Sequence, residues 1–131
     1  MDDDLRGHFD RLLERELEKL PAHVLRLLDE APLVVDDRPS ERMVQQLGLE
    51  HPNQLCGLYH GIPRTHQSVE IPHQLPESIY LFRCGICALS GCYQVGQQTA
   101  ELRRQIRITL LHEIGHHFGL TEQDLEDAGY G

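Results

Sequence analysis

The sequence contains no long apolar run and few basic residues. No stretch approaches the roughly 18 consecutive apolar residues that indicate a membrane-spanning helix, so we expect no membrane segment. Lys and Arg number 12 against 21 Asp and Glu, which gives a formal net charge of -9. This charge would repel a phosphate backbone, and no dense run of Lys and Arg offsets it locally. A nucleic acid is therefore not expected as a partner.

A secretory signal and an internal repeat are also missing from the sequence. The chain begins Met1-Asp2-Asp3-Asp4, whereas a signal peptide begins with positive charge. We therefore expect a cytoplasmic location. A chain of 131 residues suits one hydrophobic core, because a protein of this size buries roughly two-thirds of the surface that it exposes when unfolded. One domain over residues 1–131 is expected.

Cysteine is scarce, with four residues: Cys56, Cys84, Cys87 and Cys92. They could form two disulfides, but cytosolic thiols usually stay reduced. We expect Cys84, Cys87 and Cys92 to lie in one loop, where Cys56 or His60 could complete a structural zinc site. A single CxxC motif is a weak signal for such a site. Ordinary loop thiols are therefore the preferred interpretation, and a second metal site is the alternative.

The apolar pattern predicts an α+β fold. Leucines recur at helical spacing from Leu5 to Leu28, and Pro21 should divide this region into two helices, the first capped by Asp4. Apolar residues repeat at every fourth position from residue 101 to 118 and predict the longest helix. Strands are predicted over residues 32–39, 55–62 and 78–83, with a short helix over residues 40–47. We expect the helices to pack on a small mixed sheet of three or four strands.

The longest predicted helix carries the sequence His112-Glu113-Ile114-Gly115-His116. Residues four apart lie on the same face of a helix, so both imidazoles can reach one metal ion. Glu113 lies roughly 60 degrees around the axis from His116, so its carboxylate can stand beside the ion without binding it. His117 points about 100 degrees away from His116 and is expected to pack beside the site. The pattern suits a zinc ion that activates water, with Glu113 as the general base.

A third metal ligand has to come from beyond this helix. Gly119 should end the helix, because glycine tolerates a left-handed backbone, and the chain can then return with Glu122 or Asp124. The alternative role for Glu122 is that of an acid in the first turn of a last helix, within a capping box that begins at Thr121. Tyr130 could reach over the metal as an oxyanion donor.

The segment from His112 to Glu122 resembles the extended signature of the minimal zincins, a family of small bacterial zincin-like metallopeptidases. The resemblance extends more weakly over most of the chain. It implies a zincin-like minimal fold, a zinc ion held by His112, His116 and Glu122, and a hydrolase with Glu113 as its catalytic residue. Glu122 stands where that family usually has aspartate and the related metzincins have histidine. No methionine follows Glu122, so the methionine-containing turn of the metzincins is missing.

The motif and the resemblance predict a zinc-dependent metallopeptidase. Its substrate would be a peptide or an unfolded protein segment, held by backbone pairing with an edge strand. Two other functions remain open. One is a regulatory or peptide-binding module that keeps the zinc and hydrolyses little. The other is a zinc hydrolase that acts on a different amide, because the motif determines water activation and leaves the acyl partner open.

Overall fold

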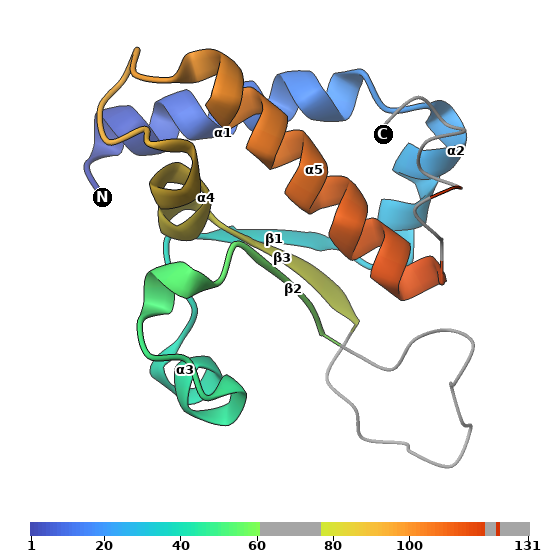
Figure 1. The fold of residues 1–131 in the computed structure, drawn as a ribbon. Helices are drawn as coiled ribbons and strands as arrows, with labels where there is room; N and C mark the ends of the chain where they lie inside the picture. The colour runs from blue at the N-terminus through green and yellow to red at the C-terminus, as the bar shows by residue number, and fades with distance from the viewer. Residues whose placement is uncertain (61–76, 120–122, 124–131) are drawn as a thin grey trace.

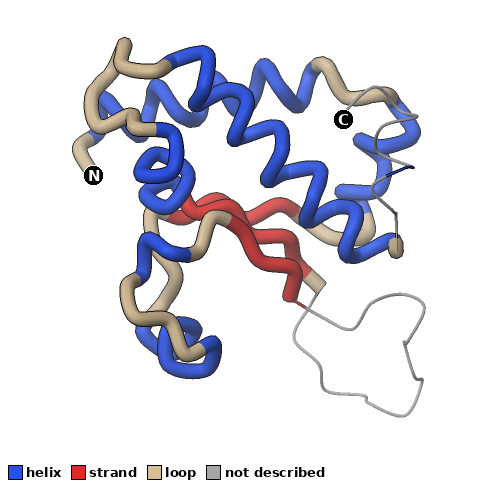
Figure 2. The backbone as a smooth tube through the Cα atoms, in the orientation of Figure 1, coloured by secondary structure: helices blue, strands red, loops and turns tan. Residues whose placement is uncertain are grey.

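The structure, a computed structural model, describes residues 1–60, 77–119 and 123. Helices pack on a mixed sheet, so the predicted α+β class is confirmed (Figures 1 and 2). None of the helices in these residues is long and apolar enough to cross a membrane. The elements in chain order are α1 (Asp3–Glu18), α2 (Ala22–Leu25), η1 (Arg26–Asp29), β1 (Leu33–Asp36), α3 (Glu41–Leu47), η2 (Pro52–Gln54), β2 (Gly57–His60), β3 (Ser78–Phe82), α4 (Arg83–Ser90) and α5 (Thr99–Phe118).

The central strand of the sheet is β3. It pairs in parallel with β1 and antiparallel with β2, so β2 lies at an edge of the three-stranded sheet that the described residues form. The N–H of Phe82 donates to the carbonyl of Cys56 at 2.8 Å. Because hydrogen-bonded and non-hydrogen-bonded pairs alternate along an antiparallel pair, the backbone groups of Gly57 and Tyr59 turn away from β3. The outer edge of β2 is therefore formed by these two residues.

The hydrophobic core lies between the sheet and the two long helices. Figure 1 shows α1 and α5 above one face of the sheet and α3 on the other side. Ile79 and Leu81 of β3 are fully buried in this core. The apolar stripe predicted for the longest helix is confirmed, because four of its members have no exposed surface: Leu102, Ile106, Leu110 and Ile114. This burial holds α5, and with it the histidine motif, against β2 and β3.

The N-terminal region is divided at Pro21, as predicted, but its first helix begins earlier than expected. The capping residue is Asp2 rather than Asp4, because an Asp2 side-chain oxygen accepts a hydrogen bond from the N–H of Leu5 at 2.8 Å. Asp4 instead lies in the first turn of α1, where the helix dipole favours negative charge. The helix starts two residues before the apolar pattern does, because a helix can begin with polar residues.

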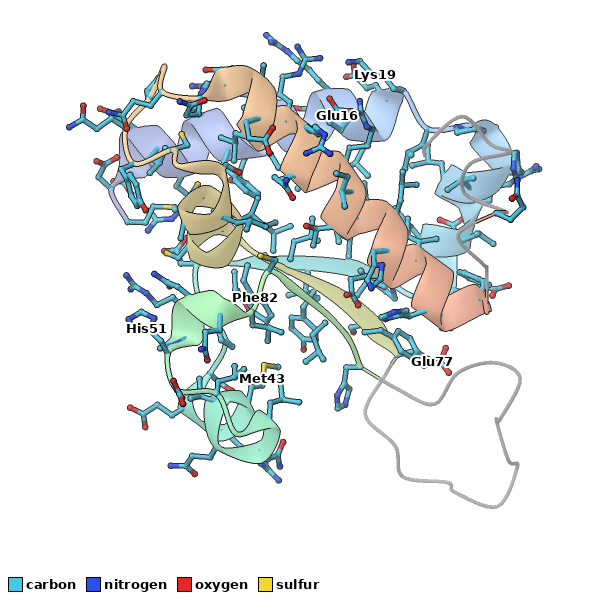
Figure 3. All side chains as sticks on the ribbon, in the orientation of Figure 1. Glu16, Lys19, Met43, His51, Glu77 and Phe82 are labelled. Carbon is cyan, nitrogen blue, oxygen red and sulfur yellow. The ribbon has the colours of Figure 1, made fainter. Side chains whose placement is uncertain are left out.

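One charged side chain on α1 is buried rather than solvated. Glu16 is 2% exposed, and its Oε1 lies 3.4 Å from Nε of Arg103 on α5 and 3.5 Å from Nζ of Lys19. Figure 3 shows Glu16 and Lys19 together on the last part of α1. A buried carboxylate is costly unless it is paired. This ion pair therefore ties α1 to α5 in addition to the apolar contacts.

The region predicted as a cysteine loop is the helix α4, so that prediction is wrong. Cys84 and Cys87 lie within α4 and are buried, and Cys92 follows the helix. The CxxC spacing is also the spacing of one face of a helix, which is why the motif did not distinguish a loop from a helix. Gly85 lies between the cysteines where a Cβ would overlap the carbonyl oxygen of Leu55. The glycine therefore allows α4 to pack closely on the segment that follows η2.

Candidate metal centre

His112 and His116 lie one turn apart on the last part of α5. Their ring centroids are 4.2 Å apart and the ring planes are inclined at 63°. Both residues are exposed, whereas Glu113 between them is buried. One ligand atom from each of the three side chains lies within 4.8 Å of the other two. Within residues 1–60, 77–119 and 123 this is the single group of three or more His, Cys, Asp and Glu side chains that is close enough to share a metal ion.

The donor atoms of this group suit zinc. Zinc binds imidazole nitrogen at about 2.0–2.1 Å and carboxylate oxygen at similar distance, with tetrahedral geometry. Two nitrogens on one such ion are about 3.3 Å apart, so small side-chain rotations would bring both rings of this site onto one ion. Gly119 ends α5 with φ 66° and ψ 26°, which is the left-handed turn that the sequence predicted. Glu122 and Asp124 lie outside the described residues.

Glu113 stands between the helix and the edge of the sheet. It is 6% exposed, and its Oε2 lies 3.6 Å from Nδ1 of His116. Burial raises the pKa of Glu113, while His116, His112 and a hydrogen bond from the backbone N–H of Tyr59 act in the opposite direction. A buried carboxylate with a raised pKa holds a proton more readily than an exposed one. This environment is the kind that a general base requires.

Gly57 on β2 makes room for Glu113. A Cβ at Gly57 would lie 2.8 Å from Cγ2 of Thr109, 3.0 Å from Cγ of Glu113 and 3.1 Å from the carbonyl oxygen of Tyr80. No side chain larger than hydrogen fits there without displacing a neighbour. Gly57 was not among the site residues predicted from the sequence. The available signal was a glycine inside a β-rich run, which often marks a close approach of two backbone segments.

A second polar cluster lies beside the histidine pair and consists of Tyr59, Glu77 and His117. His117 is 1% exposed, and its Nδ1 lies 3.5 Å from Oε2 of Glu77. The Tyr59 hydroxyl donates to Glu77, and burial together with this carboxylate raises the pKa of Tyr59 to about 12. The rings of Tyr59 and His117 pack with centroids 4.9 Å apart, so the prediction that His117 packs beside the site is confirmed. Figure 3 shows Glu77 at the start of β3, close to the last turn of α5.

The cysteines favour the interpretation as ordinary thiols. The Cys87 thiol donates a hydrogen bond to the sulfur of Cys92. Burial raises the pKa of Cys87 to about 12, and the charges of Cys92 and Cys84 act in the same direction. Metal ions bind thiolates, so a buried neutral thiol is a poor ligand. Cys84, Cys87 and Cys92 line a cavity of about 200 Å³. In the part of the chain that the structure describes, they are not among the side chains close enough to share an ion.

The family model described as zincin-like metallopeptidase matches residues 28–130. The matched region includes the sheet and the helix with the histidine motif, and it excludes α1 and α2. The curated proteins contain no match to the chain.

Proposed function

The chain belongs to the zincin-like metallopeptidase family, and we propose that it hydrolyses peptide bonds with the aid of one zinc ion. His112 and His116 would hold the ion, with Glu122, or failing it Asp124, as the third protein ligand. The observation that carries this proposal is the grouping of two exposed imidazoles and one buried carboxylate within 4.8 Å. When bound, zinc would supply an activated water molecule and polarise the substrate carbonyl.

Glu113 would carry the proton transfers of the reaction. Its carboxylate would accept a proton from the attacking water and return it to the leaving amine. The burial of Glu113 and its hydrogen bond from Tyr59 support this role, because they hold the carboxylate beside the two imidazoles. A base that is already oriented needs no reorganisation during the reaction.

The outer edge of β2 supports a peptide as the substrate. The backbone groups of Gly57 and the carbonyl of Tyr59 turn away from β3, while the N–H of Tyr59 is donated to Glu113. No other strand in the described residues pairs with this edge. An extended peptide can add to such an edge by backbone hydrogen bonding. It would then lie beside Glu113, since the N–H of Tyr59 contacts that carboxylate. A small amide without an extended backbone would not use this edge.

Zinc content and peptide cleavage, measured on the same variants, test the proposal. Glu113→Gln should keep stoichiometric zinc and lose turnover by about 10²–10⁴-fold. His116→Ala should lose both zinc and turnover, because ligand removal weakens metal binding. The matched controls are Glu101→Gln, on the same helix, and His23→Ala, at an exposed histidine of α2. Neither should change the zinc content or the turnover. Cleavage is read with a library of capped peptides.

Two contrary results would lead to different conclusions about the function. A Glu113→Gln variant with full turnover would refute the general base. A wild-type protein that binds zinc stoichiometrically and cleaves no peptide would instead indicate the regulatory or peptide-binding module.

A further inference from the structure

A small cavity beside α5 is lined by arginines and one buried glutamate. It has a volume of about 150 Å³, and its lining residues are Glu16 of α1 and Ala100, Arg103, Arg104 and Arg107 of α5. At 100 degrees per residue, the four residues of α5 fall within an arc of about 100 degrees, so they share one side of the helix. Arg107 lies roughly 140 degrees around the axis from His112. The cavity is therefore separate from the proposed zinc site.

The arginines give this cavity an excess of positive charge. Their three guanidinium groups are accompanied by two carboxylates, that of Glu16 and that of Glu101, whose Oε1 lies 3.3 Å from Nη1 of Arg104. Arg107 forms no hydrogen bond or ion pair among the described residues. The whole chain has a formal net charge of -9, so this cavity is a local exception and would attract an anion.

Glu16 differs from the arginines because one of its oxygens lacks a partner. Its Oε1 lies 3.4 Å from Nε of Arg103 and 3.5 Å from Nζ of Lys19. Its Oε2 is buried and accepts no hydrogen bond from the described part of the chain. Figure 3 shows Glu16 and Lys19 on the part of α1 that lies beside α5. A buried oxygen without a donor costs free energy, so a ligand that donates a hydrogen bond to Glu16 is favoured over one that only accepts.

The arginine side chains control access to this oxygen. The distance of 3.4 Å between Nε of Arg103 and Oε1 of Glu16 is longer than the roughly 2.7–3.2 Å of most such bonds. The Arg103 side chain is 37% exposed, and exposed side chains change rotamer rapidly. Arg103 can therefore turn its guanidinium from Glu16 toward an anion in the cavity, which opens a path to Oε2.

Hydrogen phosphate has both properties that this cavity requires. Its oxygens accept hydrogen bonds from guanidinium groups, whose paired N–H donors match phosphate, and its P–O–H group can donate to a carboxylate. Sulfate has a similar size and charge, but it carries no proton at neutral pH, and its oxygens would repel Oε2 of Glu16. A phosphate monoester has largely lost its last proton at neutral pH, because its second pKa is about 6.

We propose that this cavity binds inorganic hydrogen phosphate, with Glu16 accepting a hydrogen bond from the P–O–H group and with Arg103 and Arg107 donating to the other oxygens. Bound phosphate would supply the donor that Oε2 lacks and a partner for Arg107. It would also link α1 to α5 near the existing ion pair between Glu16 and Arg103. The proposal goes beyond peptide hydrolysis and does not depend on it.

Isothermal titration calorimetry of the zinc-loaded protein, without excess zinc, tests the site. Sodium phosphate, sodium sulfate and methyl phosphate are titrated separately at neutral pH and constant ionic strength. We expect one phosphate per chain, bound about tenfold to a hundredfold more tightly than sulfate and about tenfold more tightly than methyl phosphate. Phosphate should also raise the urea midpoint, because it binds the folded state. Equal affinity for phosphate and sulfate, or no binding of phosphate, would overturn the proposal.

Two variants identify the residues that bind the anion. Arg107→Gln should weaken phosphate binding at least tenfold. The matched control Arg26→Gln removes the same charge from an exposed arginine of η1 and should bind phosphate like the wild type. Glu16→Gln should bind phosphate and sulfate with similar affinity, because its amide can donate to a sulfate oxygen. Arg107→Gln still decides the matter if Glu16→Gln does not fold.

A further variant distinguishes this cavity from the metal centre. His116→Ala should lose zinc and still bind phosphate, since Arg107 and Glu16 are unchanged. Phosphate binding that is lost in His116→Ala and retained in Arg107→Gln would instead assign the anion to the zinc ion, and the proposal would be wrong. None of these measurements uses peptide cleavage, so a protein without peptidase activity gives the same test.

Discussion

Gly57 of β2 lies directly against the side chain of Glu113 on α5, so that a Cβ on Gly57 would be 3.0 Å from Cγ of Glu113. This one contact therefore positions β2 relative to the carboxylate of Glu113. The outer edge of β2 would bind the substrate, and the carboxylate would transfer the proton. Glu113 can occupy this position because Gly57, a residue distant in the sequence, is a glycine and has no side chain.

Gly57→Ala should lower turnover by displacing Glu113. The new methyl group would lie 2.8 Å from Cγ2 of Thr109 as well as 3.0 Å from Cγ of Glu113, so the strand and the helix must separate. Overpacking of this kind costs about 1–3 kcal/mol of stability, and a small displacement of a catalytic group can lower the rate by about a hundredfold. We expect kcat to fall while zinc remains bound, measured by peptide cleavage and metal content.

Removal of the closest neighbour should partly rescue this variant. Thr109→Ser deletes the methyl group that a Cβ at Gly57 would meet first, so Gly57→Ala with Thr109→Ser should be more active than Gly57→Ala alone. Gly7→Ala is the control, because a Cβ there would meet only the flexible end of Arg11. Full activity in Gly57→Ala would contradict the importance of the contact.

Gly85→Ala should destabilise the protein without any direct effect on the metal ligands. A Cβ at Gly85 would overlap the backbone of Leu55, which cannot move as a flexible side chain can. We expect a loss of about 3 kcal/mol or more in the free energy of unfolding, measured by urea denaturation against Gly7→Ala. An unchanged urea midpoint would show that α4 does not pack on the segment after η2 in this way.

The carboxylate of Asp37 should stabilise the folded protein at pH values above the acid range. Arg6 and Arg83 donate hydrogen bonds to its carboxylate, with Nη2 of Arg6 at 2.7 Å and Nη1 of Arg83 at 3.0 Å, and the Arg6 hydrogen bond is the largest cause that lowers the pKa of Asp37 from 3.8. A carboxylate whose pKa is lower in the folded state stabilises that state above the unfolded pKa. The contribution is lost as the pH falls through the folded pKa.

Asp37→Asn should therefore cost roughly 1–3 kcal/mol at neutral pH. The difference from the wild type should shrink as the pH falls below about 4. Urea denaturation at a series of pH values measures it, with the exposed neighbour Asp36→Asn as the control. A difference that persists undiminished in acid would assign the effect to packing rather than to charge.

Zinc should raise the melting temperature, and its removal should leave the protein folded. The core is built from apolar residues of α1, α5 and β3, whereas His112 and His116 are exposed. Binding to the folded state alone would add about 2.7 kcal/mol at a free zinc concentration of a hundred times Kd. Thermal unfolding followed by circular dichroism, with zinc and with a chelator, measures the shift. His116→Ala should show none, and unfolding on chelation alone would contradict the prediction.

Much of the fold was predictable because local patterns reflect local geometry. The fourfold spacing of apolar residues predicted α5 and its buried stripe, and Pro21 marked the break between the first helices. The α4 helix was missed, because the spacing of Cys84 and Cys87 suits both a ligand loop and a helix face. Asp2 rather than Asp4 caps α1, because several adjacent aspartates could each serve as the cap.

The sequence by itself determined that the imidazoles of His112 and His116 share one side of a helix, because four residues make about one helical turn. Only the tertiary structure decided which groups surround them. Tyr59 and Gly57 reach Glu113, and Glu77 reaches His117, because β2 and β3 pack against α5. These contacts join residues far apart in the chain. They arise because burial of the common core brings β2 and β3 against α5, and no periodic pattern in the sequence marks the residues that meet there.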